Sequence, residues 1–125
     1  MQIQTFDQFE FGMWESESFL AIAKTYKNVE GNDWRVKNLS SFYEATERYS
    51  YFHQWQKNKF DKAKICSLSE EKECTIDFIA TCKSLSGIEI KKDQEVHMIH
   101  SEWNLLDILW EDKACWYRVM WCMTC

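Results

Sequence analysis

The residues with the clearest capacity for chemistry lie in one short segment, Glu95–Glu102. It contains two histidines and two glutamates, residue types that serve as general acids, general bases and metal ligands. Side chains alternate along a strand, which places Glu95 and His97 on one face. His100 and Glu102 then lie on the other face. Only a helix would bring His97 and His100 together. The pattern therefore predicts one solvated His–Glu pair and one histidine at the edge of the core, rather than a complete site.

Acid–base catalysis by these histidines is the enzymatic interpretation of the segment. It pairs His97 or His100 with Asp77 or Glu95 as candidate catalytic residues, in an apolar pocket under a curved sheet. The chain has only three glycines, and it lacks the glycine-rich phosphate loops and the nucleophile elbow of common enzyme families. We therefore expect no cofactor, and a binding protein rather than an enzyme.

The six cysteines raise the question of a metal. Cys122 and Cys125 have the CxxC spacing, and His97 and His100 could complete a Cys2His2 zinc site. A second CxxC pair is missing, so we do not predict a bound metal. Residues 1–7 show neither the basic start nor the apolar stretch of a secretory signal. We thus expect a cytoplasmic protein whose thiols are reduced and pack as small hydrophobes, with three disulfides as the alternative.

Composition narrows the class of protein further. The chain carries 7 Trp, 8 Phe and 5 Tyr in 125 residues, with no proline, and 46% of its residues are hydrophobic. That is enough apolar surface for a packed core in a single domain spanning residues 1–125. The net charge is −5, with lysines interleaved among the acids and no basic stripe, which argues against direct nucleic-acid binding. No apolar run is long enough to span a bilayer.

Aromatic residues are also the best candidates for a binding surface. The segment 43–55 holds more rings than one helix face can bury, so we expect Tyr51 and Trp55 to contact a partner protein. Trp116 and Arg118 form a second predicted anchor on the last strand. The alternative for all four is an ordinary place in the core.

Helices are predicted in the first half of the chain. Phe19, Ile22, Ala23 and Tyr26 recur at helical spacing, which predicts a helix over 17–27. Asp33 is a predicted N-cap for a second helix that runs toward residue 60. A Ser-x-x-Glu capping box at residues 41–44 offers the alternative of two helices, broken near residues 40 and 41.

Strands are predicted from residue 62 onward. Residues 74–82 alternate in hydrophobicity and are rich in β-branched side chains, which favours a strand, although a helix over residues 68–85 is the competing interpretation. Strands are also predicted at 88–91 and 95–102. A final hairpin joins 106–110 to 115–122 through a turn at 111–113. Both faces of the last strand are apolar, so we expect it to be central.

These elements predict an α+β fold, with N-terminal helices packed on one face of a C-terminal antiparallel meander of about five strands. The function we expect is that of a small acidic protein-binding module, such as an inhibitor or an immunity or anti-defence protein of phage or bacterial conflict. The acidic charge would suit a partner protein with a basic surface. A homo-oligomer is compatible with the sequence. The alternatives are the small-ligand or acid–base domain and the structural zinc domain.

Overall fold

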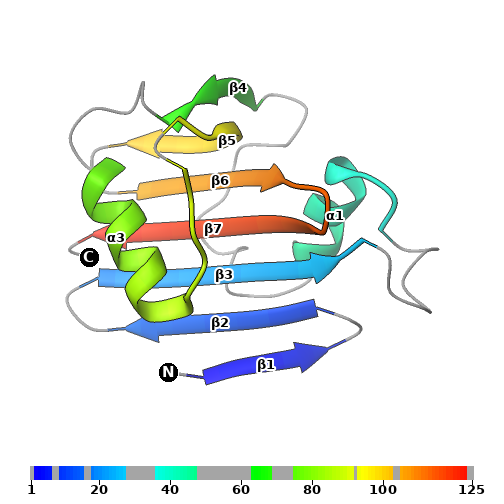
Figure 1. The fold of residues 1–125 in the computed structure, drawn as a ribbon, viewed down its shortest axis with the longest axis horizontal. Helices are drawn as coiled ribbons and strands as arrows, with labels where there is room; N and C mark the ends of the chain where they lie inside the picture. Colours follow the sequence, from blue (N-terminus) through cyan, green and yellow to red (C-terminus); the bar gives the residue numbers. More distant parts are fainter. Residues whose placement is uncertain are drawn as a thin grey trace.

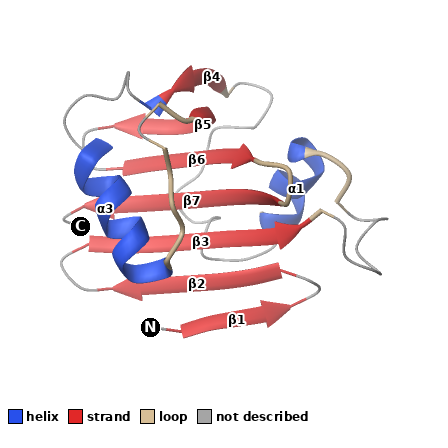
Figure 2. Cartoon of the chain, viewed as in Figure 1, coloured by secondary structure: helices blue, strands red, loops and turns tan. Residues whose placement is uncertain are grey.

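The computed structural model describes residues 2–6, 9–15, 18–27, 36–47, 63–68, 75–91, 93–102 and 105–123. Within these ranges the fold is α+β, as predicted, and it is built on one antiparallel sheet (Figures 1 and 2). The sheet has seven strands in the order β1-β2-β3-β7-β6-β5-β4. The strands are β1 (Gln2–Phe6), β2 (Phe9–Glu15), β3 (Ser18–Tyr26), β4 (Lys64–Ser67), β5 (Glu95–Glu102), β6 (Leu105–Glu111) and β7 (Cys115–Met123).

The C-terminal part of the sheet agrees with the sequence analysis. β5 covers the predicted strand 95–102, and β6 and β7 form the predicted hairpin, with Leu109 opposite Arg118. The turn is closed by Asp112, whose side chain accepts hydrogen bonds from the amides of Ala114 and Cys115. β7 lies between β3 and β6 and is buried on both faces, so the prediction of a central strand is confirmed.

The predicted helix over 17–27 is wrong, because Ser18–Tyr26 form the strand β3. Leu20 and Ile22 point to one side of the sheet and Ala21 and Ala23 to the other, and all four are buried. A strand covered on both faces reads as a continuous apolar run, which a helical stripe can imitate. Pairing with β2 and β7, which lie far apart in the sequence, decides between the two forms.

Helix α1 (Leu39–Thr46) is shorter than predicted and begins elsewhere. Asn38 is its N-cap and accepts a hydrogen bond from the amide of Ser41, whose hydroxyl in turn accepts from the Asn38 amide. This reciprocal cap replaces the one predicted at residues 41–44, and residues 40 and 41 lie within the helix. The predicted extension over 48–60 and the predicted cap at Asp33 lie outside the described residues.

Helix α3 (Thr75–Ser86) occupies the segment for which we favoured a strand. The competing helical interpretation is correct: Cys82 is buried, and Ile79 and Leu85 pack against the same core. The helix ends at Gly87, whose φ of 78° is left-handed. The predicted strand at 88–91 is wrong, because these residues form no part of the sheet. They cross the strands over β6 and β7 (Figure 1), and Ile90 is buried there.

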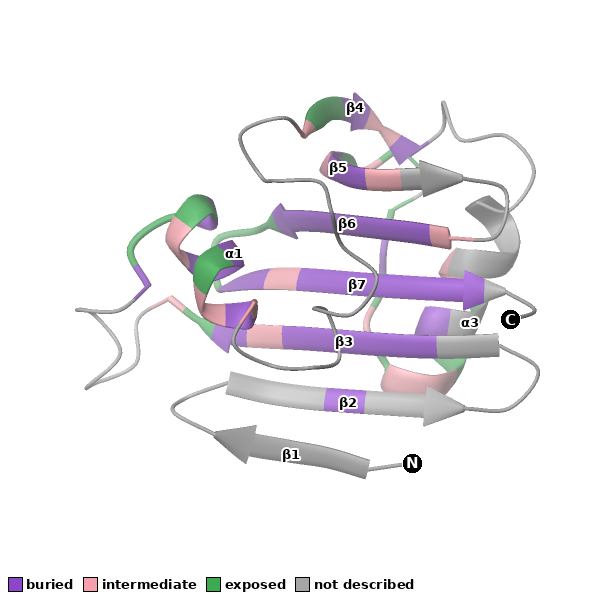
Figure 3. Cartoon of the chain, turned by 180° about the vertical axis from the view of Figure 1, so that it is seen from behind, coloured by how far each residue is buried: buried purple, intermediate pink, exposed green. Residues whose placement is uncertain are grey.

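The two described helices lie on opposite faces of the sheet, which corrects the prediction of helices on one face. Figure 1 shows α3 in front of the strands, and the reverse view in Figure 3 shows α1 in front. Each helix covers its own core. The α3-side core includes Leu20, Ile22, Ile108, Val119 and Trp121, and the α1-side core includes Ala21, Ala23, Phe42, Tyr43 and Met120. No described helix is long and apolar enough to cross a membrane.

Candidate functional site

Arg118 is the centre of the main polar site of the described structure. It lies on β7 and faces α1, and its side chain is 0% exposed. Its guanidinium donates from Nε to Oδ1 of Asp107 at 3.0 Å and from Nη2 to Oδ2 at 2.7 Å. Asp107, on the neighbouring strand β6, is also 0% exposed. The two residues therefore form a bidentate buried ion pair across the β6–β7 hairpin.

The rest of this polar site comes from helix α1. Nη1 of Arg118 donates to Oγ1 of Thr46 at 2.9 Å and to Oε2 of Glu47 at 2.8 Å. The hydroxyl of Tyr43 donates to the other oxygen of Glu47 at 3.0 Å, and the centroid of its ring lies 4.9 Å from Cζ of Arg118. Positions 43, 46 and 47 share one side of a helix, which is why all three reach the same group. We call Tyr43, Thr46, Glu47, Asp107 and Arg118 the Arg118 network.

Burial and charge act against each other in this network. Burial raises the pKa of Asp107, the Arg118 charge lowers it, and the result is a pKa above the usual range. Burial lowers the pKa of Arg118, but the carboxylates of Asp107 and Glu47 raise it by more. The net result is a pKa above the usual value, so the guanidinium stays charged. Burial and the bond to Glu47 raise the pKa of Tyr43, which therefore stays a hydrogen-bond donor. A guanidinium enclosed in this way joins parts of the fold and offers no open face to a substrate.

The predicted histidines lie beside this network, and a β-bulge changes their faces. The register of β5 against β6 shifts between Met98 and His100. His97 lies opposite Leu109 and His100 opposite Asp107, so both lie on the α1 side. The prediction that they point to opposite faces is wrong, because the extra residue of the bulge breaks the alternation. Both histidines are partly buried, and Glu95 is exposed.

The structure does not bring the other predicted acid–base and zinc residues together. Asp77 lies on α3, across the sheet from the histidines. Cys122 is buried on β7, two strands from β5, which is roughly 10 Å in strand spacing. Within the described ranges there is no group of three or more His, Cys, Asp or Glu residues that could hold a metal. Cys125 lies outside those ranges.

The four described cysteines are buried, and none of them is in a disulfide. They are Cys66, Cys82, Cys115 and Cys122. Burial raises the pKa of the Cys82 thiol to about 11, against a smaller opposing effect of its contact with Ser86. Such a thiol is a poor nucleophile near neutral pH and packs as an apolar group.

The two predicted contact residues on β7 are not at the surface. Trp116 is 5% exposed and Arg118 is 0% exposed, so neither side chain is available as an anchor for a partner. Both point inward because β7 is covered on both faces. Tyr51 and Trp55 lie outside the described residues.

An aromatic side chain does reach the surface at one end of the α3-side face. Tyr26, the last residue of β3, is 41% exposed, and Nζ of Lys24 lies 4.9 Å from the centroid of its ring. Tyr117, cross-strand from Lys24, stacks on Trp110 with ring centroids 4.9 Å apart. We call Lys24, Tyr26 and Tyr117 the tyrosine patch. Figure 1 shows α3 and residues 88–91 crossing the sheet away from this end.

The tyrosine patch is held in place by the turn between β6 and β7. The hydroxyl of Tyr117 donates to Oδ2 of Asp112 at 2.9 Å. Burial alone would raise the pKa of Asp112, but bonds from two backbone amides and from Tyr117 hold it below its usual value. The Asp112 carboxylate therefore stays ionised. The Tyr117 side chain is fixed twice, by stacking of its ring on Trp110 and by the hydrogen bond from its hydroxyl to Asp112.

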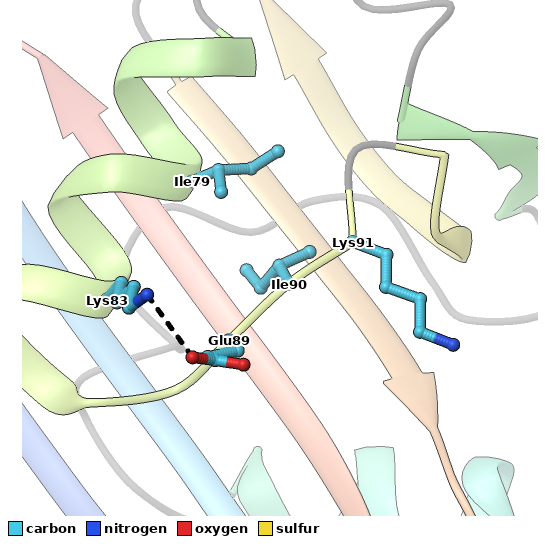
Figure 4. A pocket seen from close by; sticks show the side chains of 5 residues that line it. All are labelled: Ile79, Lys83, Glu89, Ile90 and Lys91. Carbon is cyan, nitrogen blue, oxygen red and sulfur yellow. Dashed lines mark ion pairs between the residues drawn. The ribbon is translucent and has the colours of Figure 1, made fainter.

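A shallow hollow of about 290 Å³ lies where α3 faces the extended segment after it (Figure 4). Ile79 and Ile90 supply its apolar walls. Nζ of Lys83 and Oε1 of Glu89 form an ion pair of 3.2 Å at one end, and Lys91 points away. Its size is at the lower limit of small-molecule sites. Its charged side chains are already paired or turned to solvent, so it offers little specific recognition.

The sequence analysis names Arg118 only as a surface anchor and misses the other residues of the Arg118 network and the tyrosine patch, for identifiable reasons. Asp107 and Arg118 were each single charges in apolar strands, and only the hairpin register shows that they share a face. Thr46 and Glu47, which also bond to Arg118, lie 72 and 71 positions before it in the sequence. Tyr26 was assigned to a helix stripe. Comparison of the chain with protein-family models, curated proteins and solved structures found no match.

Proposed function

We propose that this protein is a small binding module that recognises another protein by surface contact, and that the tyrosine patch belongs to its contact surface. The observation that carries the proposal is the exposed ring of Tyr26, which is linked to the fixed ring of Tyr117 through Lys24: its Nζ lies 4.9 Å from the first ring centroid and 6.0 Å from the second. Exposed tyrosines on a rigid sheet give a large apolar contact with little loss of conformational entropy, and they are enriched where proteins bind each other.

The chemistry of the remaining residues supports binding over catalysis. The main polar cluster is closed to a substrate, because Arg118 and Asp107 hold each other and are fully buried. The partner we expect is one with a basic surface, because the chain carries a net charge of −5. An inhibitor or an immunity or anti-defence protein fits this description.

The test is a binding measurement with matched variants. The partner would be identified by native mass spectrometry of the untagged protein from its own cells and then titrated calorimetrically. We expect Tyr26→Ala to weaken the Kd at least tenfold, roughly the effect of a moderate contact residue. Its free energy of unfolding should change by less than about 0.5 kcal/mol, as for other exposed positions.

The matched control is Ile65→Ala. Ile65 is 59% exposed and lies on β4, opposite His97, on the α1 side of the sheet and far from Tyr26 in strand order. It removes a comparable exposed apolar group without touching the tyrosine patch. An unchanged Kd for Tyr26→Ala, with or without a loss for Ile65→Ala, would exclude the patch as the contact surface.

A further inference from the structure

Helix α1 packs against β6 and β7, on the face of the sheet that carries the buried side chains of Leu109 and Met120. The strand β3 presents Ala21 and Ala23 to the α1 side, and both are 0% exposed. On the α3 side the same strand presents Leu20 and Ile22. Helices are normally positioned by side chains that fit as ridges into grooves of the opposing surface. The alanines of β3 and the larger side chains of β6 and β7 form an apolar floor that buries Phe42 and Tyr43. Apolar burial has no preferred direction, so it does not by itself select one helix position.

The Arg118 network supplies the directional contacts that this floor lacks. One planar guanidinium is fixed to the sheet by two bonds to Asp107 and to the helix by bonds to Thr46 and Glu47. The ring of Tyr43 lies against the same guanidinium. Hydrogen bonds of 2.7 to 3.0 Å tolerate little displacement, and a guanidinium fork fixes direction as well as distance.

We propose that the Arg118 network sets the position and rotation of helix α1 on the sheet, and that apolar packing alone is not enough to fix them. The buried ion pair acts as a conformational pin. Burial of Leu39 and Phe42 holds the helix against the sheet, and the bonds of Arg118 determine at which position on the sheet the helix lies. Buried ion pairs elsewhere give little net stability for their desolvation cost, and fixing one arrangement among several is their best-supported role.

The experiment measures the position of α1 in the full chain. Spin labels carried by noncanonical residues would replace the exposed Glu44, on α1, and Lys113, in the β6–β7 turn. Double electron–electron resonance then gives the distribution of the distance between the two spin labels. The pin is removed by Arg118→Met with Asp107→Leu, which leaves no buried charge on the sheet without a partner. We expect the distribution to become at least twice as wide, or to shift, while the β6–β7 amides keep their protection from hydrogen exchange.

A second variant tests the same proposal by changing the residues of the helix, and it remains informative if the first variant does not fold. Thr46→Val with Glu47→Gln weakens both helix contacts of Arg118 and leaves the sheet pair intact. It should also widen the distribution, by less than the first variant. The matched control, Lys37→Ala, changes an exposed residue next to the same helix and should leave the distribution unchanged. A distance distribution that is unchanged in both network variants would overturn the proposal. An equal change in the control variant would overturn it as well.

Discussion

The two faces of the sheet hold their helices by different physical means. The α3-side core is made of large apolar side chains and two buried cysteines, among them Leu20, Ile108 and Trp121. The four buried polar or charged residues of the described chain, Thr25, Thr46, Asp107 and Arg118, all lie on the α1 side. The comparison shows one sheet that uses apolar packing alone on one face and adds directed hydrogen bonds to apolar packing on the other.

The largest expected effect tests the polar face. Arg118→Met leaves the carboxylate of Asp107 buried without its partner, and we expect a loss of about 3–5 kcal/mol in the free energy of unfolding in urea. Adding Asp107→Leu should recover most of that loss, because no uncompensated charge then remains. Recovery of less than a third would mean that the ion pair itself stabilises the fold, and the contrast between the faces would fail.

The pH dependence of the single variant offers an independent check. Burial raises the pKa of Asp107, and Arg118 opposes this, so removing Arg118 should raise that pKa further. A carboxyl group with a raised pKa in the folded state favours folding at low pH and opposes it as pH rises through that pKa. The deficit of Arg118→Met should therefore shrink as pH falls. A constant deficit would show that lost packing, rather than the buried charge, is its cause.

The second prediction tests the apolar face through Cys82. Its pKa rises from 9.0 to about 11 because it is buried, so the unfolded chain loses this proton before the folded one does. Stability from this group is complete below pH 9 and is lost as pH rises toward 11. Two pKa units correspond to about 2–3 kcal/mol at most. Urea unfolding from pH 8 to 11 should show this loss in the wild type.

The control for that loss is Cys82→Ala, which removes the thiol and keeps a small apolar side chain. It should be less stable at pH 8, because it leaves space in the core, but its stability should fall less between pH 9 and 11. If the free energy of unfolding falls equally with pH in the wild type and in Cys82→Ala, Cys82 does not titrate as a buried thiol.

How far the sequence predicts this molecule differs from one element to another. The β6–β7 hairpin and β5 were predictable because their patterns are local: alternation, a turn with Asp112, and apolar residues on both faces. β3 and α3 were not, because each pattern fits both a helix and a strand. Partners from distant parts of the chain choose between them: β2 and β7 for β3, and the sheet core for α3.

The candidate sites were predicted less well than the fold. The histidines were singled out correctly as neighbours in sequence, but the bulge at Met98–His100 moved them to one face, and nothing in the local pattern signals a bulge. The Arg118 network needs the hairpin register and the position of α1 together. Exposure of Tyr26 and burial of Trp116 are properties of the whole sheet, so aromatic content alone cannot separate them.

The smallest expected effect concerns how α1 begins. Asn38→Ala removes the side-chain acceptor for the amide of Ser41, and we expect a loss of about 1 kcal/mol. If Arg118 holds the other end of the helix, that loss should appear mainly as faster hydrogen exchange in the first turn. Amides near Glu47, whose own N–H bonds to the Tyr43 carbonyl, should be less affected. Uniform acceleration along the helix would mean that α1 opens as one unit, and that the network does not fix its C-terminal end independently of the cap.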